Sequence, residues 1–145
     1  MNELRRDPIT GRWNIIFIEN PAAVSDFKVE PHRKNAEGCP FCYGREHELP
    51  HEIVAHRKFG PANSPGWTVR VVPNKYPALR IEGDLNKEGV GLFDMMNGVG
   101  AHEVIIDTPD HFKDMANMSL AETEEVIWAY LARSIGVSSP VSTRP

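Results

Sequence analysis

Cysteine is scarce in this sequence: Cys39 and Cys42 are the only two in 145 residues. Two cysteines are too few for the disulfide framework that stabilises small secreted domains. No apolar run approaches the roughly 20 residues that a membrane helix needs. The charged start, MNELRRDPITGRW, has no apolar segment behind it of the kind that a signal peptide requires. We therefore expect a cytoplasmic protein without a membrane partner.

Basic residues are not in excess either. The formal net charge is −4 and the isoelectric point is about 5.8. Proteins that hold nucleic acid by electrostatic attraction are usually basic, so nucleic acid is not an expected partner, although a local anion site remains open. The 41% of hydrophobic and 25% of charged residues suit a globular domain with a hydrophobic core.

Hydrophobic patterns predict several strands and one loop. The β-branched and aromatic run RWNIIFI (12–18) predicts a buried strand, and five glycines in 83–100 predict a long flexible loop. Further strands are predicted at 52–57, 67–73 and 101–107. Alternation in the second of these places Trp67, Val69 and Val71 on one face, with Arg70 on the other.

One helix is predicted near the end of the sequence. Ser119 and Glu122 have the spacing of a capping box, and Ile127, Tyr130 and Leu131 lie on one apolar face. Serine, threonine and proline then fill seven of the twelve positions in 134–145, which predicts a disordered tail. We expect an α+β domain over 1–133 with a mainly antiparallel sheet. It looks incomplete, because one helix covers little of such a sheet.

The cysteine pair, in GCPFCYGREHE (38–48), admits four interpretations. A disulfide is disfavoured in a cytosolic chain, and a thioredoxin-like redox pair is expected at a helix start after a strand, which the preceding residues do not predict. Two inert buried cysteines remain possible. A structural zinc site is favoured, because two thiolates two residues apart on a glycine- and proline-containing turn can bind one tetrahedral ion.

With no second cysteine pair, histidines would have to complete such a site. His102 is the best placed, because it starts a predicted strand and shares a face with Val104 and Ile106. A core histidine bonded to the backbone is the alternative for His102. His47 and His51 are close to the cysteines in sequence, but they lie in a polar stretch typical of solvated loops. The candidates considered are His32, His47, His51, His56, His102 and His111.

Four motifs, taken together in their order along the chain, resemble a known family. They are ELRRDPITGRW (3–13), CPFC (39–42), PGWTVRVVPNKYPAL (65–79) and GAHEVIIDTPDH (100–111). Together they resemble the N-terminal half of galactose-1-phosphate uridylyltransferase, a branch of the histidine-triad superfamily, over about residues 3–133. The resemblance implies a histidine-triad-like fold that is incomplete relative to the family.

The resemblance also implies an activity and a metal. The family moves a uridylyl group between a UDP-sugar and a hexose 1-phosphate, in galactose metabolism, through a covalent nucleotidyl-histidine. Its members form homo-oligomers, and many carry zinc. By the resemblance, Cys39, Cys42 and His102 match three zinc ligands. A later His-Pro-His motif would provide the fourth ligand and the nucleophile.

Four further residues match the nucleotide site of the family. Phe41 matches a region that lies against the base, and Asn74 matches an asparagine that binds the nucleotide. Lys75 and Tyr76 follow in the same loop. The residues alone favour a simpler interpretation, in which this stretch is a strand end followed by an exposed turn.

The sequence departs from the family pattern in two places. The stretch ENPAAVSDF (19–27) lacks the basic residues that would contact phosphate, and the sequence contains no His-Pro-His. His111 is the nearest alternative nucleophile, but its position after Pro109 at a strand exit predicts a solvent-facing turn. We therefore expect a truncated transferase that lacks its catalytic residue and is inactive alone.

Two other functions stay open. One is a related phosphorylase acting on dinucleoside polyphosphates or ADP-sugars with the same histidine chemistry. The other is a non-catalytic nucleotide-binding or assembly module.

Overall fold

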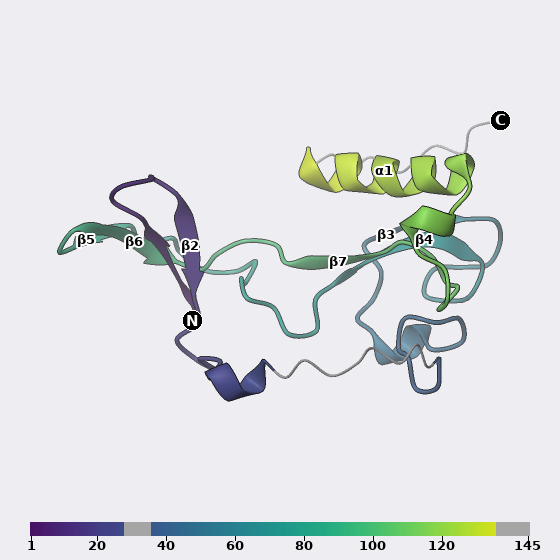
Figure 1. The fold of residues 1–145 in the computed structure, drawn as a ribbon, viewed down its shortest axis with the longest axis horizontal. Helices are drawn as coiled ribbons and strands as arrows, with labels where there is room; N and C mark the ends of the chain where they lie inside the picture. The colour runs from purple at the N-terminus through teal and green to yellow at the C-terminus, as the bar shows by residue number, and fades with distance from the viewer. Residues whose placement is uncertain (28–35, 136–145) are drawn as a thin grey trace. The chain divides into compact units, whose positions relative to one another are not determined.

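The computed structural model describes residues 1–27 and 36–135, which form two compact units. The first comprises residues 1–27 and 76–102, and the second comprises residues 36–75 and 103–135. Each contains one sheet whose paired strands all run antiparallel, so the predicted α+β class with mainly antiparallel sheets is confirmed (Figure 1). The predicted tail lies almost wholly outside the described residues.

The sheet of the first unit has four strands in the order β2-β1-β6-β5. The strands are β1 (Glu3–Arg6), β2 (Trp13–Ile16), β5 (Glu88–Val90) and β6 (Phe93–Asn97). Asp7 forms the turn between the first two, where its Oδ1 accepts the amides of Ile9 and Thr10, both at 2.8 Å. These backbone donors, Thr10 first, lower the pKa of Asp7 because they stabilise its charged form.

Two expectations for this unit are wrong. The strand predicted over 12–18 is shorter and is not buried, because β2 is an edge strand paired only with β1, and its Trp13 and Ile15 are 43% and 40% exposed. The glycine-rich loop is instead the β5–β6 hairpin. Gly91 begins its two-residue turn at φ +61°, a conformation that glycine adopts without steric cost. Strand β1 was not predicted.

The sheet of the second unit has the order β3-β4-β7. Its strands are β3 (Val54–Arg57), β4 (Trp67–Pro73) and β7 (Glu103–Ile106), which confirms three predicted strands. Because β4 is central, it is buried on both faces. Val69 and Val71 belong to one core cluster, whereas Trp67 and Val72 belong to another.

A register shift explains why Trp67 leaves the face that alternation predicted for it. His56 pairs with Val69, but Arg57 pairs with Trp67, so Thr68 is an extra residue on β4. Such a bulge moves the residues beyond it to the opposite face of the sheet. Trp67 therefore lies with Val72, away from Val69.

The helix α1 (Leu120–Ser134) covers one face of this sheet (Figure 1). Its capping box is confirmed: Ser119 Oγ accepts the Glu122 amide at 3.4 Å, and a Glu122 carboxylate oxygen accepts the Ser119 amide at 2.8 Å. Val126 and Ala129 form the packed face, whereas Ile127 remains 45% exposed. No helix in the described ranges has the length and apolarity to cross a bilayer.

Three short 3₁₀ helices complete the described structure. They are η1 (Val24–Asp26), η2 (Glu46–Glu48) and η3 (Met115–Asn117). The second follows the cysteine pair directly.

Candidate metal centre

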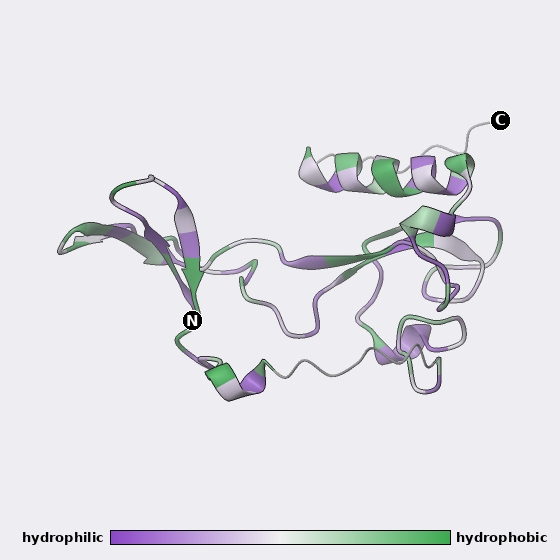
Figure 2. Cartoon of the chain, in the orientation of Figure 1, coloured by the Kyte–Doolittle hydropathy of each residue, from purple (hydrophilic) through white to green (hydrophobic). Residues whose placement is uncertain are grey.

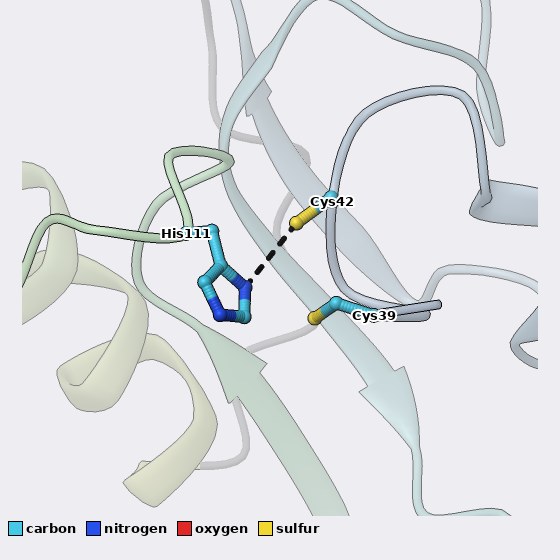
Figure 3. A group of neighbouring side chains, drawn as sticks. All are labelled: Cys39, Cys42 and His111. Carbon is cyan, nitrogen blue, oxygen red and sulfur yellow. Dashed lines mark hydrogen bonds between the residues drawn. The ribbon is translucent and has the colours of Figure 1, made fainter. Parts of the chain in front are cut away.

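Cys39, Cys42 and His111 meet in the second unit (Figure 3). Their sulfur and ring nitrogen atoms all lie within 4.8 Å of one another, and Cys42 Sγ is 3.6 Å from His111 Nδ1. All three residues are partly buried. Among the described residues, no other group of three or more histidine, cysteine or acidic side chains is close enough together to hold a metal ion.

Backbone turns place the two thiols together. The Cys42 amide donates to the Cys39 carbonyl at 3.4 Å, which closes a tight turn. Gly38 and Gly44 flank this turn at φ +77° and +84°, in the left-handed region where a side chain would be strained. Both sulfurs consequently face the same space.

His111 reaches the cysteines from the loop after β7. The Asp110 amide donates to Thr108 Oγ1 at 3.2 Å, and Asp110 Oδ1 accepts the Phe112 amide at 3.0 Å. These bonds fold the chain back after Pro109 and direct His111 to the cysteine turn, as Figure 3 shows. The sequence-based expectation of a solvent-facing turn residue does not describe His111, which is half-buried.

The donor set fits zinc. Zinc–sulfur bonds of about 2.3 Å and zinc–nitrogen bonds of about 2.0 Å, at a tetrahedral angle, separate the two ligand atoms by about 3.5 Å. The observed distance of 3.6 Å between Cys42 Sγ and His111 Nδ1 is close to this value. Without a cation, burial raises the pKa of Cys42, and the neighbouring Cys39 raises it further. A divalent cation would reverse this preference, because it stabilises thiolates.

A cavity of about 230 Å³ adjoins the three residues. Phe41, between the cysteines, lines it and is 40% exposed. Lys113 also lines the cavity, but its amine is paired with Glu122 at 2.6 Å. The site thus combines candidate metal ligands with an accessible aromatic ring and nearby charges.

His102 does not belong to this group. Its Nδ1 accepts the backbone amide of Ala78 at 2.9 Å, in the first unit. This contact corresponds to the alternative of a backbone-bonded histidine. His47 and His51 are exposed and also lie outside the group.

The remaining predicted residues follow β4. Asn74 is half-buried and Lys75 is exposed, and neither lines the cavity beside Phe41. Tyr76, in the first unit, is 81% exposed. The structure therefore brings Phe41 to the candidate metal centre, whereas the roles of the other three residues stay predictions.

A sequence signal for His111 was present. The motif TPDH ends a predicted strand with a proline, and such a turn can reverse the chain toward a neighbouring loop. No sequence pattern related this turn to the cysteines, which are about 70 positions earlier. The pairing of β7 with β4 supplies that link.

Comparison with known proteins finds sequences and folds similar to this chain. No model of a protein family matches the chain. ADP-glucose phosphorylase from Arabidopsis thaliana is 33% identical over 136 residues, which is 90% of this chain and 38% of that protein. Galactose-1-phosphate uridylyltransferase from Thermotoga maritima is 27% identical over 139 residues, covering 95% and 37% respectively.

Solved structures agree with these relatives. A crystal structure of the Arabidopsis thaliana ADP-glucose phosphorylase with bound ADP-glucose is 28% identical at a TM-score of 0.50, and covers 94% of this chain and 38% of its own. A uridylyltransferase structure is similar in fold at a TM-score of 0.55 and 23% identity, covering 92% and 34%.

The chain thus has a histidine-triad-like α+β fold. It is related to the galactose-1-phosphate uridylyltransferase family, as its motifs indicated. It spans a little over a third of the length of the curated relatives that it matches.

Proposed function

We propose that this chain provides the metal-holding and nucleotide-binding part of a sugar-nucleotide transferase. The activity would be uridylyl transfer between a UDP-sugar and a hexose 1-phosphate, in galactose metabolism. One observation carries the proposal: Cys39, Cys42 and His111 meet beside a cavity that Phe41 lines, in a chain related to proteins named ADP-glucose phosphorylase and galactose-1-phosphate uridylyltransferase.

Zinc is the proposed metal, because two sulfurs and an imidazole nitrogen are its preferred protein ligands. Bound there, it would join the cysteine turn to the loop after β7 and favour the thiolate forms of the cysteines. Three residues of the group would hold it, and a closed structural site takes a fourth ligand. The role is structural, since it would fix the loop that carries Phe41.

Phe41 is the proposed contact for the base. Its ring is 40% exposed and borders the cavity, so one face is accessible for stacking. Asn74, Lys75 and Tyr76 are proposed to contact the rest of the nucleotide. Lys75 is exposed, which leaves its amine accessible to a phosphate.

A second candidate is an ADP-sugar phosphorylase. The relative named ADP-glucose phosphorylase has the higher identity of the two, 33% against 27%. The two candidates differ in the base and in the acceptor of the nucleotidyl group. Binding measurements with UDP-glucose and ADP-glucose separate them.

The 145-residue chain is proposed to be inactive alone. Transfer through a nucleotidyl-histidine requires a positioned histidine nucleophile, and the sequence contains no His-Pro-His. His111 faces the two cysteines and would be occupied by the metal. We expect no covalent label when the zinc-loaded protein is incubated with UDP-glucose carrying a labelled α-phosphate.

The test measures binding of UDP-glucose and ADP-glucose by calorimetry, with Phe41→Ala and a matched control, Phe59→Ala. Phe59 is exposed in the same unit and does not line the cavity. The proposal expects weaker binding in Phe41→Ala alone. No binding of either sugar nucleotide would contradict it, and acid-labile label on a histidine would contradict the proposed inactivity. Binding of free nucleotide without a preference for its sugar would favour a non-catalytic module.

A further inference from the structure

Glu46 is a buried carboxylate next to the candidate metal centre. It is the first residue of η2 and lies four positions after Cys42. Only 4% of its surface is exposed. A carboxylate that leaves water is strongly destabilised unless hydrogen bonds replace its hydration, so the contacts of Glu46 indicate what this burial achieves.

The Glu46 carboxylate joins the cysteine loop to the centre of the sheet. One oxygen, Oε1, accepts the indole N–H of Trp67 at 2.9 Å. The other, Oε2, accepts the backbone amide of Gly44 at 3.0 Å. Trp67 is fully buried on β4, whereas Gly44 is two positions after Cys42. A single side chain thus connects the cysteine loop to the most deeply buried strand.

Neighbouring contacts strengthen this connection. The Glu46 carbonyl accepts Arg70 Nη2 at 3.4 Å, and Arg70 is itself buried and paired with Glu52 at 3.1 Å. The Tyr43 hydroxyl donates to the Trp67 carbonyl, and the two rings meet edge to face with centroids 5.3 Å apart. The end of the cysteine loop is therefore fixed to β4 through both side chain and backbone.

Strand β4 also positions the third candidate ligand, His111. His111 follows β7, which pairs with β4 from Arg70 to Pro73. The cysteines and the histidine reach their meeting point from separate segments, and each segment is attached to the same strand. On the cysteine side, the Glu46 bridge is one of these attachments, together with the contact of Tyr43 with Trp67.

We infer that Glu46 is a positioning residue for the metal centre: it holds the Cys39–Cys42 turn at the distance from His111 that one metal ion requires. This role rests on the proposed metal centre. Glu46 does not touch the metal, and it acts by ordering the loop before the ion binds. Residues that orient metal ligands typically change metal affinity about 10- to 100-fold when they are replaced.

Glu46→Gln is the informative substitution. Glutamine has the same size, but its NH₂ donor would replace one of the two carboxylate oxygens. Because Trp67 and Gly44 donate to separate oxygens of Glu46, one of these two donors would then face the NH₂ group. Glu48→Gln is the matched control, because Glu48 belongs to the same 3₁₀ helix and makes only a surface ion pair with Arg45 at 3.0 Å.

The experiment measures zinc affinity by competition with a chelator, and the absorption spectrum of bound Co²⁺, on folded protein well below its melting temperature. We expect Glu46→Gln to weaken zinc binding about 10-fold or more and to alter the Co²⁺ spectrum. Glu48→Gln should match the wild type. A Glu46→Gln protein that is less stable but binds both metals as the wild type does would overturn the positioning role.

A measurement on the wild type keeps the inference testable if the variant does not fold. Hydrogen exchange of the Gly44 amide and the Trp67 indole N–H should be slow in the metal-free protein, because the bridge precedes metal binding. Fast exchange at either group would overturn the inference. A wild type that binds neither Zn²⁺ nor Co²⁺ would overturn the metal centre itself, whereas normal binding with an unaffected variant rejects only the role of Glu46.

Discussion

The two units bury very different amounts of hydrophobic surface. In the second unit, Trp67, Val69 and Val126 are almost completely inaccessible, and α1 packs on the sheet. In the first unit, Trp13 and Ile15 remain about two-fifths exposed on an edge strand. Hydrophobic residues nevertheless occur on β2 and along the β5–β6 hairpin (Figure 2). A similar hydrophobic content thus gives a core in one unit and an accessible sheet in the other.

The difference in burial follows from whether a second layer of structure covers the sheet. A sheet buries a face only when another element covers it, and α1 provides that cover in the second unit. In the described part of the first unit, the only helix is the three-residue η1. The candidate metal centre lies in the unit that has a core, where its ligands are attached to a rigid strand.

Replacing one tryptophan in each unit should reveal this contrast most strongly. Trp67→Ala removes a fully buried side chain and should lower the free energy of unfolding by about 3–5 kcal/mol. Trp13→Ala removes a side chain that is 43% exposed and should cost far less. Thermal and urea unfolding followed by circular dichroism measure both changes. Equal losses for the two variants would contradict the difference in burial between Trp67 and Trp13.

Zinc should stabilise the second unit selectively. At free zinc about 100 times the dissociation constant, binding to the folded state adds about 2.7 kcal/mol to the free energy of unfolding. Hydrogen exchange should slow in β4 and β7, and not in β1 and β6. His111→Ala and Cys42→Ser should abolish the effect, whereas His102→Ala should retain it. Loss of zinc binding in His102→Ala alone would instead support the ligand set that the family resemblance implied.

The cap of α1 should make a smaller contribution. Ser119→Ala removes the side-chain acceptor for the Glu122 amide and should cost about 1 kcal/mol. Thermal unfolding measures this loss of stability. Because α1 covers the core of the second unit, the backbone amides of that unit should also exchange hydrogen faster in the variant. Ser64→Ala serves as a control, since Ser64 is outside the helix and bonds the Pro61 carbonyl. An unchanged unfolding midpoint in Ser119→Ala would contradict the prediction.

The smallest expected effect is a pH dependence at the same cap. A hydrogen bond from Lys113, followed by bonds from Ser119, lowers the pKa of Glu122 from its ordinary value of 4.5 to about 2. A depressed pKa means that the contribution is complete above pH 4.5 and is lost as the pH falls toward 2. The stability difference between wild type and Glu122→Gln should therefore shrink over this range. Glu124→Gln, an exposed position in the same helix, is the control variant.

Sequence patterns predicted those helices and strands that are determined by their own residues, without contacts from distant parts of the chain. The capping box of Ser119 and Glu122 and the three strands of the second unit could be recognised directly. The β5–β6 hairpin was missed because its glycines were taken as signs of flexibility, although Gly91 provides the turn that pairs the two strands. The position of Trp67 depends on a bulge at Thr68, which only strand pairing reveals.

The candidate site was half predictable for the same reason. Cys39 and Cys42 share one turn, so their spacing favoured a metal site and provided two of its ligands. The pairing of β7 with β4 brings His111 to them, and the resulting contact between His111 and Cys42 spans about 70 positions, so it leaves no local pattern. His102 satisfied the strand periodicity, but its backbone partner, Ala78, could not be inferred from sequence.

The order of strands in the first unit has a consequence for synthesis on the ribosome. Strand β1 pairs on one side with β2, a few residues later, and on the other side with β6, where Glu3 meets Asn97. Until residue 97 emerges, β1 and β2 form a two-stranded hairpin, which is only marginally stable in water. The nascent chain therefore exposes Ile15 and the free edge of β1 until β6 has been synthesised. This interval is when chaperones would bind it, and when a pause in translation would most increase aggregation.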